Sequence, residues 1–132
     1  MTAEALLGIR PKRAGEQIRK GLPYKTLQKF SRQIGLSTRE ITDVFDMPLR
    51  TIQRRKEAGK LNKEESNGLY RAARVFAAAI GFFEGDIEAA RGWIREEVPA
   101  LGNRRPIDML DTDADAQLVL VTLARLEDGI IT

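Results

Sequence analysis

Apolar residues recur at spacings of three and four along most of the chain, and no segment of useful length alternates apolar with polar residues. Positions three and four apart share one face of a helix, whereas the two faces of a strand alternate. The pattern therefore predicts an all-α fold. The predicted helices cover residues 24–33, 37–45, 48–60, 63–82, 86–97 and 113–127, with a single helical turn at 107–110.

Two of these helices begin with a recognisable start signal. Ser37 and Glu40 have the spacing of a capping box, and so do Asn62 and Glu65. In such a box each side chain bonds the other residue's backbone N–H, which satisfies donors left open at a helix start. Residues 1–20 show no comparable signal and no clear period, so we expect a poorly ordered arm or one short helix there.

The two short helices in the first half lie close together in sequence. Asp46 and Met47 supply a tight turn between them, and Pro48 suits the first position of the second helix. Gly59 offers its stop. Two short helices joined in this way form a helix-turn-helix unit.

The second helix of this unit carries five basic residues and one acid. On a helical wheel Leu49, Ile52 and Lys56 fall on one side, which predicts a narrow seam against the protein. Arginine on the opposite side can pair with guanine in a DNA major groove, and threonine can contact a base or a phosphate. A merely solvated charged face is the alternative. The predicted DNA-binding residues are Arg50, Thr51, Gln53 and Arg54, with Arg39, Arg55 and Lys56 expected on phosphates.

The last predicted helix, residues 113–127, is apolar around most of its circumference. A helix of this kind is buried on more than one side. Because the chain is small, we expect the second side to contact another protein. Just before this helix, Arg104 and Arg105 either pair with nearby aspartates or present a cation to a partner.

Composition narrows the chemistry of the 132-residue chain, which is 42% hydrophobic and 31% charged. It contains no cysteine and no histidine. Disulfides, thiol nucleophiles, the commonest general base and the commonest zinc ligand are therefore missing, so we expect no enzyme and no cofactor. Asp111, Asp113 and Asp115 imitate the start of a calcium loop, but Ala116 and Thr122 occupy its glycine and glutamate positions. We therefore expect no metal site.

Charge is divided unevenly along the chain. Residues 1–63 hold 15 Lys and Arg against 6 Asp and Glu, whereas residues 64–132 hold 7 against 13. Such a division suggests two surfaces with different partners, the basic one suited to phosphates. The longest apolar run, residues 75–83, is far shorter than the ~20 residues that span a bilayer, and a cytoplasmic location is expected.

Both halves resemble the Xre/MbcA/ParS antitoxin family of type II toxin-antitoxin systems. In the first half the resemblance rests on residues 50–56, 59–61 and 65–66, which are similar to the family's helix-turn-helix. In the second half it covers the family's toxin-binding domain, and the match extends over residues 21–132. Its signature in the second half consists of Trp93, residues 99–102, residues 105–106, Asp108, Leu110, Thr112 and residues 123–129.

The resemblance implies an antitoxin that binds a RES-type, NAD-consuming toxin through its C-terminal domain and represses its own operon as a homodimer. It implies an arm at 1–20, an Xre-like helix-turn-helix domain at 21–62 and a small helical toxin-binding domain at 63–132. A dimeric repressor without a toxin partner is the alternative. The residues expected to bind the toxin are Arg104, Arg105, Arg125, Glu127, Asp128, Gly129, Ile130, Ile131 and Thr132.

Overall fold

A computed structural model describes residues 1–129, and this part of the chain is helical, with two isolated bridge pairs and no sheet. The predicted all-α fold is confirmed. Three 3₁₀ turns accompany the α-helices: η1 (Pro11–Arg13), η2 (Pro99–Leu101) and η3 (Pro106–Met109). The α-helices are α1 (Ala3–Leu7), α2 (Ala14–Lys20), α3 (Tyr24–Ile34), α4 (Thr38–Val44), α5 (Leu49–Ala58), α6 (Lys63–Phe82), α7 (Ile87–Ile94) and α8 (Asp113–Glu127).

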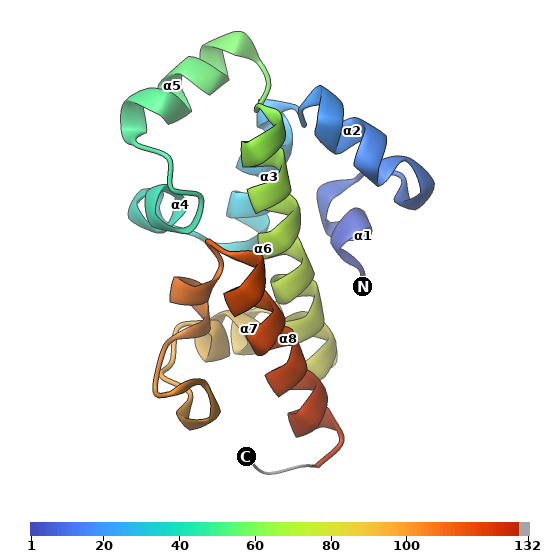
Figure 1. The fold of residues 1–132 in the computed structure, drawn as a ribbon, viewed down its shortest axis with the longest axis vertical. Coiled ribbons are helices and arrows are strands. Elements are labelled where there is room, and N and C mark those ends of the chain that lie inside the picture. Colours follow the sequence, from blue (N-terminus) through green and yellow to red (C-terminus); the bar gives the residue numbers. More distant parts are fainter. Residues whose placement is uncertain (130–132) are drawn as a thin grey trace.

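The long helix α6 runs through the middle of the molecule (Figure 1). It packs against α1 and α2 near the N-terminus and against α7 and α8 in the second half. Ala72 and Ala73 are fully buried, and their small side chains let neighbouring helices approach closely. Both predicted capping boxes are formed, at Ser37 with Glu40 and at Asn62 with Glu65.

The connection from α2 to α3 is fixed to the start of α6. The backbone N–H of Leu22 donates to the buried hydroxyl of Ser66 at 2.8 Å, and the N–H of Leu61 donates to the Leu22 carbonyl at 2.8 Å. Gly21 lies beside this junction with φ of +93°, where a Cβ would stand 2.1 Å from the Leu61 carbonyl oxygen. Only glycine fits this close approach.

The expectation for residues 1–20 was wrong. Two helices, α1 and α2, form there and pack on α6 (Figure 1). Leu6, Leu7 and Ile18 are buried in the same core as the rest of the chain. Apolar residues in such short helices show too little periodicity to be recognised, and the contacts that order them are made with a distant segment.

Three predicted helical features also differ from the structure. Pro48 is the N-cap rather than the first residue of α5, and α7 ends at Ile94 rather than near Glu97. Leu49 and Lys56, predicted to face the protein, are exposed. No helix in residues 1–129 is long and apolar enough to cross a membrane.

Candidate nucleic-acid and partner interfaces

The helix-turn-helix unit consists of α4 and α5 and the turn between them. The Ser37 hydroxyl accepts a hydrogen bond from the Glu40 backbone N–H at 3.1 Å and starts α4. Asp46 takes a left-handed conformation with φ of +49°, and Met47 is buried beneath the turn. The turn is thereby anchored in the core, which fixes the direction of α5.

The outward face of α5 is polar and basic. No residue of α5 is buried, and Arg50, Gln53, Arg54 and Lys56 are exposed. Thr51 is half-buried, and its hydroxyl accepts a hydrogen bond from Arg54 Nη2 at 3.3 Å. Four of the predicted DNA-binding side chains therefore project from one helix into solvent.

Arg55 is placed differently from these four. Its Nε donates to Glu65 Oε1 at 2.7 Å, and this bond raises the pKa of Arg55. The same carboxylate oxygen accepts the Asn62 backbone N–H at 2.9 Å and completes the capping box of α6. Arg55 thus joins α5 to the start of α6, a structural contact that the sequence pattern did not indicate.

Arg39 lies on the first turn of α4, outside α5. Its side chain is exposed and lines a small groove with Asp43, Arg105 and Asp108. Arg105 donates to both carboxylate oxygens of Asp108 at 2.9 and 3.0 Å, which raises the pKa of Arg105. The structure therefore brings one predicted DNA-binding residue close to one predicted toxin-binding residue.

Arg104 also contacts an aspartate. Its Nε donates to the Leu101 carbonyl at 3.0 Å, and its Nη1 lies 3.4 Å from Asp115 Oδ2. The two arginines thus both show the pairing with nearby aspartates that the sequence allowed. Both side chains remain about half exposed, at 49% and 47%, so pairing leaves their surfaces accessible.

An apolar strip lies on the outer face of α8. Leu118 is 48% exposed and Val121 is 36% exposed, whereas Val119 and Leu123 are buried against the core. Leu118 and Val121 line a groove of about 390 Å³ that is also lined by Arg104 and Arg125. We call this groove and its two exposed apolar side chains the α8 surface.

The remaining predicted toxin-binding residues lie around the end of α8. Glu127 is the last residue of the helix, Asp128 is its C-cap and Gly129 follows, and all three are exposed. Ile130, Ile131 and Thr132 lie outside the described residues. The structure thus brings Arg104 and Arg125 to the α8 surface and places Arg105 nearer to α4.

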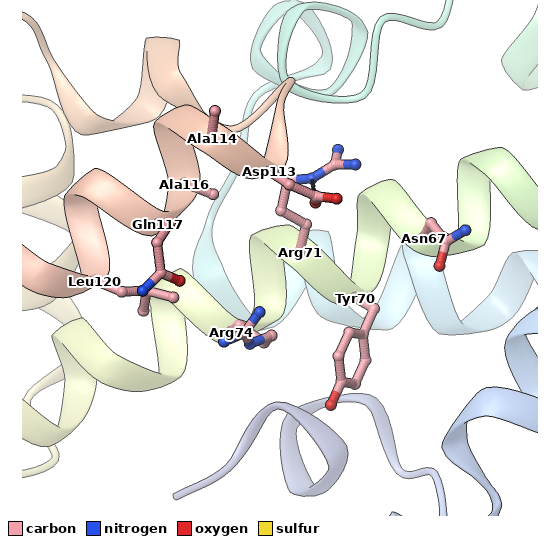
Figure 2. A pocket seen from close by; sticks show the side chains of 9 residues that line it. All are labelled: Asn67, Tyr70, Arg71, Arg74, Asp113, Ala114, Ala116, Gln117 and Leu120. Carbon is pink, nitrogen blue, oxygen red and sulfur yellow. Dashed lines mark hydrogen bonds and ion pairs between the residues drawn. The ribbon is translucent and has the colours of Figure 1, made fainter.

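A third groove, of about 610 Å³, lies between α6 and α8 (Figure 2). On its wall Arg71 Nε donates to Asp113 Oδ1 at 2.6 Å, and this bond lowers the pKa of Asp113. Tyr70 points away from α8, and its hydroxyl donates to Glu4 of α1 at 2.9 Å. These contacts hold α1 and α8 onto α6, and none of the predicted site residues lines this groove.

Helix α7 connects the second half to the helix-turn-helix. Arg95, its C-cap, donates from Nε and Nη2 to the two carboxylate oxygens of Glu40 at 2.8 and 2.7 Å. Arg91 donates from Nη1 to the Ile34 carbonyl at the end of α3 at 2.9 Å. Sequence reasoning did not identify these arginines, because their partners are more than fifty residues away.

Comparison with known proteins finds matches along most of the chain. Residues 13–74 match the antitoxin Xre-like helix-turn-helix domain, and residues 77–129 match the antitoxin Xre/MbcA/ParS C-terminal toxin-binding domain. The first matched range ends, and the second begins, inside α6.

Similar whole proteins carry related descriptions. "Antitoxin Xre" of Photorhabdus laumondii is 29% identical over 87% of this chain and 78% of its own length. "Antitoxin Xre" of Yersinia enterocolitica is 29% identical over 89% of this chain and 80% of its own length. A "Prs ADP-ribosylating antitoxin" of a Sphingobium strain is 24% identical over 85% of this chain and 76% of its own length.

Proposed function

The chain belongs to the Xre/MbcA/ParS antitoxin family, and from this membership we propose that it neutralises a RES-type, NAD-consuming toxin and represses its own operon. The observation that carries the proposal is that one short chain contains both an Xre-like helix-turn-helix domain and an antitoxin toxin-binding domain. Its relatives are antitoxins and its two matched domains are binding domains, so the protein is not an enzyme.

Operator binding is assigned to α5. In helix-turn-helix proteins the N-terminal residues of the second helix reach base edges while the first helix crosses the backbone. Arg50, Gln53 and Arg54 are exposed at this end of α5, with Thr51 beside them. Arg39, on the first turn of α4, is suited to a phosphate contact. The proposed phosphate contacts also include Arg55 and Lys56.

Toxin binding is assigned to the α8 surface and the end of α8. An exposed apolar strip accompanied by arginines has the composition of a protein interface, in which apolar residues and arginine are enriched. Leu118 and Val121 would form the apolar part, with Arg104 and Arg125 beside it. The proposed interface also includes Arg105, Glu127, Asp128, Gly129, Ile130, Ile131 and Thr132.

We propose that the repressor is a homodimer, as two-fold operators and paired half-sites are typical of helix-turn-helix repressors. Operator DNA and the toxin would be met in the cytoplasm. The domain division expected from the sequence, at residues 20 and 62, stays a prediction.

The toxin assignment is tested in cells. The gene adjacent to the coding sequence is expressed alone and together with this chain. Growth arrest by the neighbour alone and rescue by the full chain are expected, with a fall in cellular NAD that co-expression prevents. Arrest without rescue would contradict the antitoxin assignment, and arrest at constant NAD would contradict the NAD-consuming class.

Repression is tested separately with a reporter under the promoter of the operon. We expect the chain to lower reporter expression, and the Arg50→Ala/Arg54→Ala double variant to restore it. The double variant should still rescue growth, because α5 and the α8 surface are formed by different helices. Unchanged expression with the unmodified chain would contradict repression of the operon while leaving toxin binding intact.

A further inference from the structure

Leu49 has an unusual position for a large apolar side chain. It is the first residue of α5 and is 62% exposed, and no residue of α5 is buried. A single exposed leucine is ordinary on a protein surface. Leu49, however, stands at the start of a helix predicted to read DNA. The charges of the neighbouring side chains indicate which kind of partner could cover it.

Those surroundings are basic and polar. Arg50 and Arg54 form one row four residues apart on the exposed side of α5, and Leu49 and Gln53 form the neighbouring row. Lys56 lies on the same flank as Leu49. Glu57 continues the row of Leu49 and Gln53 and is exposed as well. The exposed side chains of α5 therefore carry three positive charges and one negative charge, so a partner seated on this face should be anionic.

A second copy of the chain, bound through the same face, would not be an anionic partner. Two such faces would place arginines and lysines against one another, and like charges repel. DNA supplies negative charge, and its major groove also presents one apolar group, the C5-methyl group of thymine. DNA therefore offers phosphates to the basic side chains of α5 and a methyl group to the apolar side chain of Leu49.

We propose that Leu49 is a specificity residue that packs against a thymine methyl group in the operator, beside the base contacted by Gln53. This inference rests on the proposed DNA-binding function of α5 and adds one element to it. The arginines would select guanine by hydrogen bonding, whereas Leu49 would select thymine by burying its methyl group. Leu49 makes no charged contact, so its contribution should be independent of salt.

The experiment begins with selection of binding sequences by the full-length chain from a pool of random DNA duplexes. Each thymine of the selected sequence is then replaced singly by uracil, which removes only the methyl group. We expect one or two replacements to weaken binding about fourfold, the effect of losing one buried methyl group. In Leu49→Ala the same replacements should have no effect.

Gln33→Ala is the matched control, because it truncates another exposed, uncharged side chain on a different helix, α3. It should retain the full response to uracil. Both variants should melt at the temperature of the unmodified chain, since neither side chain is buried.

The outcomes separate the two proposals. Failure to select any sequence would contradict the DNA-binding function itself and the Leu49 contact with it. A selected sequence whose thymines can all be replaced without loss would contradict only the Leu49 contact. An equal response to uracil in Leu49→Ala would assign the methyl contact to another residue and would also overturn the inference.

Discussion

The carboxylate of Glu40 belongs to two structural contacts at once. Its Oε1 accepts the Ser37 backbone N–H at 2.9 Å, which caps α4, and also accepts Arg95 Nη2 at 2.7 Å. The hydrogen bonds from Arg95 are the main reason that the pKa of Glu40 is lowered from its ordinary value. Glu65 has the same arrangement, since it caps α6 while accepting Arg55 Nε.

The lowered pKa gives a pH-dependent stability. A carboxyl group whose pKa is lower in the folded state stabilises that state above its unfolded pKa, and the stabilisation is lost as pH falls through the folded pKa. In Glu40→Gln the cap is retained, because glutamine also serves in a capping box, but the charge is lost. We expect a lower free energy of unfolding by about 1 kcal/mol at pH 7, allowing for partial solvent exposure.

This difference is measured by urea denaturation from pH 7 down to pH 3. It should shrink below about pH 4.5, where the unmodified Glu40 begins to be protonated in the unfolded chain. Glu96→Gln is the control, because Glu96 is exposed beside the same arginine. A difference of equal size at pH 7 and pH 3 would show that the charge of Glu40 does not stabilise the fold.

Two neighbouring arginines of α5 should respond oppositely to truncation. Arg54 is exposed, so Arg54→Ala should leave the melting temperature unchanged and weaken operator binding by about 1–3 kcal/mol with relaxed sequence preference. Binding titrations on the selected duplex and on single-base variants measure this. Equal weakening on every sequence, with a reduced salt dependence, would identify a phosphate contact instead.

Arg55→Ala should lower stability by about 1 kcal/mol, because it removes the ion pair that joins α5 to Glu65. Thermal unfolding monitored by circular dichroism measures the loss. If Arg55→Ala melts like Arg54→Ala, the ion pair contributes nothing measurable to stability.

At the scale of the elements, the sequence predicted those features that depend on residues close together in the chain. The capping boxes at Ser37 and Asn62 lie within three residues of their partners, and α4 and α6 begin where they were predicted. The exposure of Leu49 was missed because a helical wheel shows which residues share a face but not how far a neighbouring element covers that face. The helices at the N-terminus were missed for the related reason that α6 stabilises them.

The candidate sites likewise contain features that the sequence predicts and contacts that it does not. The basic face of α5 and the excess of apolar residues on α8 can be recognised from composition and period. The contacts of Arg55, Arg91 and Arg95 could not be predicted, because each joins segments whose proximity depends on the complete fold. The family assignment itself was confirmed, since short motifs in both halves were sufficient to identify it.

The exposed and buried faces of α8 should respond differently to substitution. Leu118→Glu should weaken toxin binding by about 1–3 kcal/mol without lowering the melting temperature, because the side chain is exposed until a partner covers it. Leu123→Ala, in the buried face of the same helix, should instead lower stability by about 2–5 kcal/mol. Binding to the purified toxin and thermal melting are measured on both variants. Unimpaired binding by Leu118→Glu would exclude the α8 surface from the interface.

At the scale of the molecule, the two matched ranges do not correspond to two separate cores. Buried residues from Ala3 to Leu123 form one hydrophobic cluster, and α6 contributes to it along its length. A small protein with one continuous core unfolds cooperatively. The basic and acidic halves therefore differ in surface charge while sharing a single interior.

We expect one unfolding transition for the whole chain. Fluorescence of Trp93, which reports on the second half, and far-ultraviolet circular dichroism, which reports on all helices, should give the same denaturation midpoint. Deletion of residues 1–20 should lower that midpoint for both signals equally, because it uncovers α6. Two separate midpoints would show that the halves unfold independently.

The continuity of α6 also bears on how such genes can evolve. The junction between the two matched ranges falls at Val75 and Phe76, which lie within α6 and are buried in the core. A recombination event could join the 5′ half of one such gene to the 3′ half of another. The two ends of α6 would then come from different proteins, in which they had evolved to pack against different helices. Operator preference and toxin preference are therefore expected to be inherited together, and new pairings to arise by point substitution on α5 and α8 rather than by exchange of halves.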